Sequence, residues 1–226
     1  MRWSIRALSA LFALSILVTS APADQLFYTA TYVEVVSGAA AQAAALLRAY
    51  RDASRADASA LRLEILQRID RPAHFAIIGA WKDAAAFEGH ADAAPARPLR
   101  DGLAPLRASP DDERRHHGLV VAGAPAPAVG AGIYVVTHVD VIPPRKDDGV
   151  AALTQVAAES RGDAGLVRFD VLQQTSRPNH FTVVEAWRDR PAADLHTAAP
   201  HTRQFRARLA PMSGALYDER LYAPLP

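Results

Sequence analysis

The sequence contains no cysteine, so it can form no disulfide and offers no thiolate to a substrate or a metal ion. It also has almost no net charge, with 25 Lys and Arg against 24 Asp and Glu. Such a balance gives no strongly basic surface of the kind that attracts nucleic acid or an anionic membrane. We therefore expect a chain that is stabilised by packing alone and has neither of these as a partner.

Long apolar runs are missing after the first two dozen residues. Residues 1–23 have a basic head, a short apolar run and small residues before Asp24, which is typical of a secretory signal peptide. A membrane anchor is the alternative, but the run is shorter than the roughly 20 residues that a span needs. We expect cleavage after Ala23 and a mature protein that is exported, periplasmic or secreted.

What the sequence does contain is one pattern that occurs twice. Equivalent residues stand 106 positions apart, since 177−71, 187−81 and 196−90 all give 106: Arg71 and Arg177, Trp81 and Trp187, His90 and His196. This period is far longer than a solenoid repeat and suits one small domain per copy. The prediction is a domain at residues 26–121, a linker rich in Ala, Pro and Gly at 122–131, and a second domain at 132–226.

Each copy has the same predicted order of elements: a strand, a helix, a hairpin, helical segments and a last strand. In copy one the ranges are a strand at 27–36, a helix at 39–56, a hairpin of 61–69 and 75–82, a helical stretch at 96–106 and a strand from 112. In copy two they are a strand at 133–142, a helix at 147–161, a hairpin of 167–175 and 181–188, a helical stretch at 202–212 and a strand from 218. Asp83 and Asp189 are expected to cap the short helices that carry His90 and His196. This is the split βαβ plan of ferredoxin-like α+β domains, with helices on one sheet face and the other face in need of a cover.

One set of side chains in copy two stands out as a candidate site. On an extended strand Glu185 and Trp187 point to the same face, and His196 follows on the next helix. A carboxylate, an indole and an imidazole would then line one pocket. The alternative is that Trp187 fills the core, His196 bonds a loop and Glu185 is solvated at the sheet rim. Duplication preserves scaffolds as well as sites, so the repeat leaves both open.

The remaining histidines show no spacing typical of a metal site: His74, His116, His117, His138, His180 and His201. His74 and His180 follow turns, where a hydrogen bond to the backbone is the expected role. Adjacent histidines on a strand face opposite ways and cannot share an ion. The sequence therefore predicts no metal site and no cofactor.

The order of elements, with Glu-x-Trp at the end of the hairpin and a His nine residues after the Trp, resembles the antibiotic biosynthesis monooxygenase family, whose members are dimeric α+β barrels. Copy two matches through Glu185, Trp187 and His196, while copy one keeps the Trp and the His but has Gly79 in place of the acid. The resemblance implies that the two ferredoxin-like halves press their sheets together within one chain, as a pseudo-dimeric barrel.

Some family members oxidise quinols or polyketide phenols with O₂ and without a metal or flavin. The resemblance therefore implies a cofactor-independent monooxygenase for a small aromatic or quinol-like substrate. His196 would be its base, Trp187 a pocket wall and donor, and Glu185 an orienting acid. Four further side chains are candidates for substrate binding: Tyr134, Trp81, His90 and Tyr28.

Two other functions are open to such a barrel. Related barrels degrade haem with an Asn on the first strand, but the one asparagine of this chain, Asn179, lies in a predicted turn. Haem degradation is therefore disfavoured. The rival prediction is a non-catalytic module that binds a small ligand or a partner, which is suggested by the Gly79 that replaces the family acid.

Overall fold

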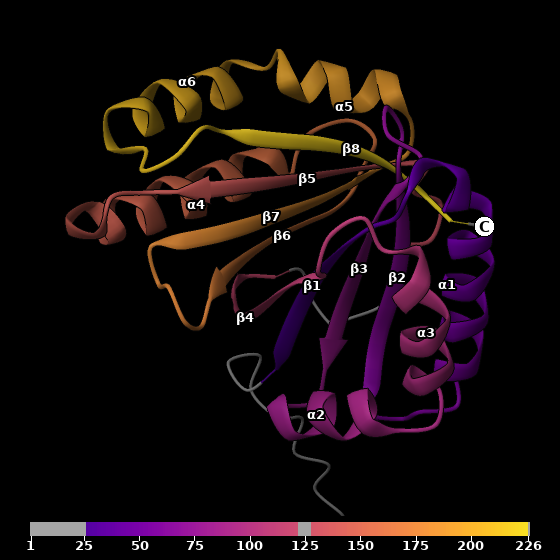
Figure 1. Ribbon diagram of the computed structural model, residues 1–226. Helices are drawn as coiled ribbons and strands as arrows, with labels where there is room; N and C mark the ends of the chain where they lie inside the picture. Colours follow the sequence, from indigo (N-terminus) through magenta and orange to yellow (C-terminus); the bar gives the residue numbers. More distant parts are fainter. Residues whose placement is uncertain (1–25, 122–127, 226) are drawn as a thin grey trace, which may run out of the picture.

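The computed structural model describes residues 26–121 and 128–225, and these build one closed antiparallel barrel with helices on its outside (Figure 1). The strands of the first half are β1 (Phe27–Glu34), β2 (Ala60–Arg68), β3 (His74–Trp81) and β4 (Asp112–Val120). Those of the second half are β5 (Ile133–Asp140), β6 (Leu166–Gln174), β7 (His180–Trp187) and β8 (Asp218–Pro224). The predicted signal peptide and residues 122–127 of the predicted linker lie outside the described residues.

Three α-helices accompany each half. They are α1 (Ala40–Ser54), α2 (Ala84–Asp92) and α3 (Ala96–Leu103) in the first, and α4 (Lys146–Ser160), α5 (Arg190–Thr197) and α6 (Pro200–Leu209) in the second. Short 3-10 turns adjoin them: η2 (Ser37–Ala39), η3 (Ala104–Leu106), η4 (Pro143–Arg145) and η5 (Ala210–Met212). The predicted caps are present, because Asp83 and Asp189 accept backbone N–H bonds of 2.7 and 2.9 Å from Ala86 and Ala192. In the described ranges, no helix has the length and apolar character that crossing a bilayer requires.

The strand order around the barrel explains how two similar halves become one body. It runs β1-β3-β2-β8-β5-β7-β6-β4, so each half keeps the order 4-1-3-2 of a ferredoxin-like sheet. The two seams, β2 with β8 and β4 with β6, each join strands of different halves. The predicted pseudo-dimeric α+β barrel is confirmed, and neither half closes without the other.

The alternation of side chains along the strands divides the core into an inner and two outer layers. Inside the barrel, apolar residues of both halves meet: Tyr28, Ala30, Leu66, Ile78, Tyr134, Val136, Leu172, Val184 and Tyr222. Outside it, Leu47 of α1 packs with Ile65 and Phe75, and Leu153 of α4 packs with Val171 and Phe181. Any site between sheet and helices therefore belongs to one half, on the outer face of the barrel.

Charged side chains also lie within the barrel, which the sequence pattern did not indicate. Bulges near the start of β2 and β6 precede Arg62 and Glu64 on one strand and Arg168 and Asp170 on the other. Arg62 Nη2 donates to Asp170 Oδ2 at 2.9 Å, and Arg168 donates to both carboxylate oxygens of Glu64 at 2.5 and 3.0 Å. All four side chains are buried. The two halves are therefore linked by reciprocal ion pairs across the pseudo-twofold axis.

Removing one member of this tetrad should destabilise the barrel strongly. We expect Asp170→Asn to cost about 3–5 kcal/mol of unfolding free energy, because it removes a carboxylate that lies 2.9 Å from Arg62 and 3.1 Å from Arg168 and leaves two buried guanidinium groups with one carboxylate. The measurement is urea-induced unfolding. The matched control is Asp194→Asn, which removes the exposed Arg190–Asp194 pair of 2.7 Å and should cost no more than about 0.5 kcal/mol. Equal effects of the two changes would contradict a structural role for the tetrad.

Candidate active site

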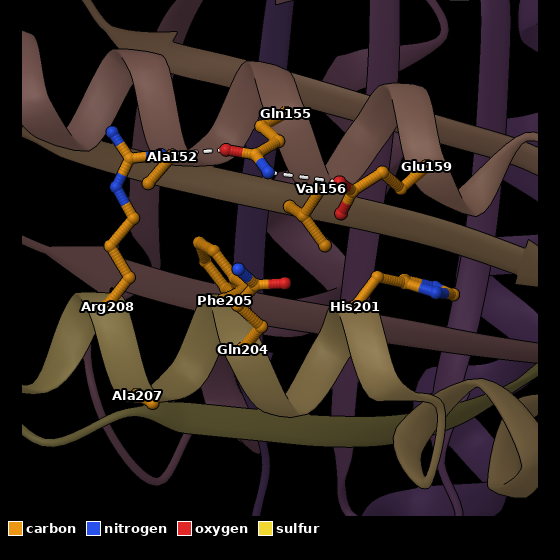
Figure 2. Close-up of a pocket in the computed structure, with 9 residues that line it drawn as sticks. All are labelled: Ala152, Gln155, Val156, Glu159, His201, Gln204, Phe205, Ala207 and Arg208. Atoms are coloured by element: carbon orange, nitrogen blue, oxygen red, sulfur yellow. Dashed lines mark hydrogen bonds between the residues drawn. The ribbon is translucent and has the colours of Figure 1, made fainter.

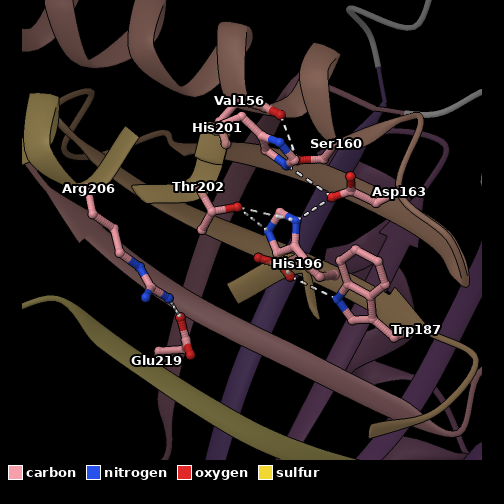
Figure 3. Close-up of polar contacts among 10 residues, drawn as sticks. Val156, Ser160, Asp163, Trp187, His196, His201, Thr202, Arg206 and Glu219 are labelled. Atoms are coloured by element: carbon pink, nitrogen blue, oxygen red, sulfur yellow. Dashed lines mark hydrogen bonds and ion pairs between the residues drawn. The ribbon is translucent and has the colours of Figure 1, made fainter. Parts of the chain in front are cut away.

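The structure brings together Glu185, Trp187 and His196 of the second half on the outer face of the barrel. Trp187 Nε1 donates to Glu185 Oε2 at 2.9 Å, and the rings of Trp187 and His196 lie 4.8 Å apart between centroids (Figure 3). Glu185 Oε2 is 3.8 Å from His196 Nε2. Less than a tenth of each side chain is exposed, so these three residues are packed inside the protein as well as being in polar contact with one another.

Burial determines the protonation of this group. It raises the pKa of Glu185 to about 8, against the N–H bond from Trp187, so the carboxyl is largely neutral at pH 7. Burial also lowers the pKa of His196, while the adjacent Asp163 acts in the opposite direction. The ring is therefore largely a neutral imidazole.

Asp163, in the turn after α4, joins two histidines. Its Oδ2 lies 2.7 Å from His196 Nδ1 and 3.0 Å from His201 Nε2, and Thr202 Oγ1 approaches His196 at 3.4 Å (Figure 3). His201 lies in the first turn of α6 and lines a groove of about 430 Å³ between α4 and α6 (Figure 2). Two histidines and a carboxylate therefore converge, and one of the three, His201, lines the groove.

The first half repeats the Asp–His pair but gives it a different neighbour. His90 Nδ1 lies 2.6 Å from Asp57 Oδ2, and its Nε2 lies 3.0 Å from the Tyr50 hydroxyl. The indole of Trp81 donates to Thr29 Oγ1 at 3.0 Å. This half thus holds a continuous chain of hydrogen bonds from a carboxylate through an imidazole to a phenol.

Gly79 is a site of close packing in this arrangement. A Cβ at this position would lie 2.6 Å from both Thr29 Oγ1 and Trp81 Nε1. Gly79 pairs with Thr29 across the strands, as Glu185 pairs with Val135 in the second half. Each half therefore supplies one acceptor for the N–H of its Trp indole. In the first half the acceptor is Thr29 on β1, and in the second half it is Glu185 on β7.

The first half contains a pocket on the outer face of the barrel. A pocket of about 160 Å³ lies between the sheet and helices α2 and α3, lined by Thr29, Tyr50, Ile77, Trp81, His90, Leu99 and others. At three equivalent positions the second half has larger side chains, with Glu185 for Gly79, Phe205 for Leu99 and Tyr217 for Asp111. Gly79 itself does not line the pocket, and the space beside it is taken by Thr29 Oγ1 and Trp81 Nε1, so the first half has no room for the acid that the second half carries.

The predicted substrate-binding residues divide into two groups. Trp81 and His90 line the pocket of the first half. Tyr28 and Tyr134 instead belong to the cluster inside the barrel, where the Tyr134 hydroxyl donates to Glu64 Oε1 at 2.9 Å. They lie on the opposite face of the sheet from the Trp–His pairs.

Sequence reasoning missed the two aspartates and Tyr50. Asp57 and Asp163 are 106 positions apart, so the repeat itself contained the signal that they accompany His90 and His196. Tyr50 lies in the predicted helix at 39–56, and its contact with His90 depends on tertiary packing.

Comparison with known proteins identifies relatives of both halves. A family model described as antibiotic biosynthesis monooxygenase matches residues 26–98 and 132–208. The chain is 29% identical over 85 residues to "Uncharacterized protein sll1783" of Synechocystis, covering 38% of this chain and 54%, about half, of that protein. It is 22% identical over 76 residues to "Putative monooxygenase YcnE" of Bacillus subtilis, covering 34% of this chain and 80% of that protein.

Solved structures share the whole two-half barrel. A "Putative monooxygenase" from Fusobacterium nucleatum has a TM-score of 0.80 at 12% identity, covering 89% of this chain and 93% of its own. One from Lactobacillus acidophilus has a TM-score of 0.74 at 12% identity, covering 89% and 95%. An "anthrone oxidase-like protein" has a TM-score of 0.66 at 12% identity, covering 89% and 91%. At this identity they establish the fold and nothing further.

The tight contact at Gly79 predicts that two glycine-to-alanine substitutions in the first half change the stability in opposite directions. Gly79→Ala should cost about 1–3 kcal/mol of unfolding free energy, because the new methyl group displaces the Trp81 indole or Thr29. Gly89→Ala is the matched control in the same half. Gly89 is exposed within α2 with nothing within 4 Å of a new Cβ, so this change should stabilise by up to about 1 kcal/mol. Thermal and urea unfolding check both, and a neutral Gly79→Ala would contradict the close packing.

Proposed function

Because the chain belongs to the antibiotic biosynthesis monooxygenase family, we propose that it oxidises a small phenolic or quinol-like substrate with O₂, without an organic cofactor, in the pocket of its first half. The observation that supports this choice is the hydrogen-bonded chain Asp57–His90–Tyr50, which ends in that pocket. The second half has a similar Asp–His pair, but Glu185 stands where the first half has Gly79.

The size and lining of the pocket suit one aromatic ring. Its volume is about 160 Å³, and an apolar protein cavity of roughly 150 Å³ is enough to bind benzene. Ile77, Leu99 and Trp81 supply apolar wall, and His90 and Tyr50 supply the polar groups. A larger fused-ring substrate would extend toward the charged side chains that also line the pocket, such as Arg107 and Glu113.

The polar chain is arranged to accept a proton. Hydrogen bonds from Ser59 and His90 outweigh partial burial and lower the pKa of Asp57 to about 2, so its carboxylate is ionised. It accepts the Nδ1 proton of His90, which leaves Nε2 as the acceptor for the Tyr50 hydroxyl. Burial raises the pKa of Tyr50 to about 12, so the phenol keeps its proton at neutral pH.

This geometry supports a proton relay. A substrate hydroxyl that donates to the Tyr50 oxygen passes its proton to Tyr50 as Tyr50 passes its own to His90. The imidazolium that forms is stabilised by Asp57 at 2.6 Å. The products of this step are a substrate anion and a cationic His90, with the charge balanced inside the pocket.

The substrate anion then supplies the electrons. Transfer of one electron to O₂ gives a radical pair, which combines into a new C–O bond and a peroxide anion. The peroxide takes back the proton from His90, and loss of water, with the one hydrogen that the attacked ring carbon bears in the hydroxyl form of the substrate, leaves a carbonyl. One oxygen atom of O₂ enters the product and the other leaves as water, which is the balance of a monooxygenase. The surrounding apolar walls exclude bulk water from the anion.

Oxygen uptake with a panel of anthrone-type phenols and hydroquinones tests this proposal. We expect His90→Ala to lower the rate by about 10²–10⁴-fold, because the proton acceptor is lost. His117→Ala, whose ring is exposed on β4, is the control and should keep the wild-type rate. Mass spectrometry after reaction with ¹⁸O₂ should find one labelled atom in the product.

Two results would overturn the assignment. Loss of uptake in His196→Ala but not in His90→Ala would place the reaction in the second half, as the sequence alone predicted. Ligand binding by the wild type without any O₂ consumption would establish the rival function, a non-catalytic binding module.

A further inference from the structure

We propose that the second half binds a divalent transition-metal ion of the zinc class through His196, His201 and Asp163. These three side chains come from α5, from α6 and from the turn that follows α4. The site lies outside the pocket proposed for oxidation and is independent of that function. It also departs from the sequence prediction of no metal site, which rested on spacing along the chain.

The geometry of the three side chains suits one ion. Their ligand atoms all lie within 4.8 Å of one another. Asp163 Oδ2 is 2.7 Å from His196 Nδ1 and 3.0 Å from His201 Nε2. Two ligands of a tetrahedral zinc ion with bonds of about 2.0–2.2 Å stand roughly 3.4 Å apart. Binding therefore requires the Asp163 oxygen to move away from the two ring nitrogens by about 0.4–0.7 Å, within the reach of small side-chain rotations.

The chemistry of the donor set limits the class of ion. Two imidazole nitrogens and one carboxylate oxygen suit Zn²⁺, Co²⁺ and Fe²⁺ better than the hard ions Ca²⁺ and Mg²⁺, which prefer oxygen ligands alone. Three protein ligands leave a fourth position, as in zinc sites that hold a water molecule. His201 borders the groove of about 430 Å³ between α4 and α6, which provides a path for the ion and the water (Figure 2).

Glu185 is placed to orient one of the ligands. Its Oε2 lies 3.8 Å from Nε2 of His196, the ring nitrogen that does not face Asp163, and the Trp187 indole holds the carboxyl in place. Metal-binding histidines commonly donate their second N–H to a nearby oxygen acceptor such as a carboxyl or carbonyl group. The distance of 3.8 Å is longer than a hydrogen bond, so Glu185 acts as a positioning residue for His196 once the imidazole turns toward it on binding the ion.

The first half provides an internal comparison. Asp57 and His90 stand 106 positions before Asp163 and His196, but Pro95 occupies the position of His201 and Gly79 that of Glu185. The third ligand and the orienting carboxyl are thus both specific to the second half. In the first half, the second nitrogen of His90 contacts Tyr50 instead.

Metal titration of the full-length protein without a polyhistidine tag tests the proposal. After treatment with a chelator, the wild type should bind one equivalent of Zn²⁺ by calorimetry, and one equivalent of Co²⁺ should give visible d–d bands. We expect His201→Ala to weaken binding by more than about 100-fold, because a ligand is lost, and Glu185→Gln to weaken it by about 10-fold. Asp57→Asn is the matched control from the first half and should bind as the wild type does. Circular dichroism establishes that each variant is folded.

Three outcomes would overturn the site: no binding by the wild type, unchanged affinity in His201→Ala, or equal loss in Asp57→Asn. In each case Asp163 would serve only as a hydrogen-bond acceptor for two histidines. The titration contains no substrate, so its failure is distinguishable from failure of the proposed oxidation.

Discussion

The reciprocal ion pairs inside the barrel are the constraint on which the rest of the structure depends. Arg62 with Asp170 and Arg168 with Glu64 cross from one half to the other, where both partners are buried. Buried charges are tolerated only when they are paired, so the pairs allow one relative placement of the halves. That placement lets β2 meet β8 and β4 meet β6, and it fills the interior with side chains. The pocket of the first half lies under the helices, on the outer face.

Duplication supplied two such outer faces, and the two have since become different. The difference begins with one hydrogen bond, because a buried indole N–H needs an acceptor. Thr29 provides it beside Gly79 in the first half, and Glu185 provides it beside Val135 in the second. In the first half the acceptor is on the neighbouring strand and Gly79 has no room for a side chain, whereas in the second half the acceptor is a glutamate on the same strand as the indole. The same scaffold can therefore present a small-molecule pocket on one side and a cluster of His and Asp ligands on the other.

The fold could be predicted from the sequence because it depends on local patterns that occur twice. The period of 106 residues and the caps at Asp83 and Asp189 indicate two ferredoxin-like halves, each with an uncovered sheet face, and the resemblance to the family implies the barrel that joins them. Site residues were less predictable, since their contacts are set by tertiary packing. The sequence correctly indicated that Trp187 and His196 are neighbours, but it did not show that Tyr134 points into the barrel. The sequence could not show that Gly79 makes room for Thr29 and Trp81, because in a sequence such a glycine looks like a lost side chain. The inward charges follow bulges that no alternation pattern reveals.

In the functions proposed above, the two halves share a scaffold but bind different ligands. The most direct test is a crystal structure of the protein soaked with a hydroquinone under anaerobic conditions. We expect electron density for one aromatic ring in the first half, with a ring hydroxyl within hydrogen-bond distance of Tyr50 and with Trp81 as a wall. A ring bound against Trp187 and His196, or equally in both halves, would contradict it.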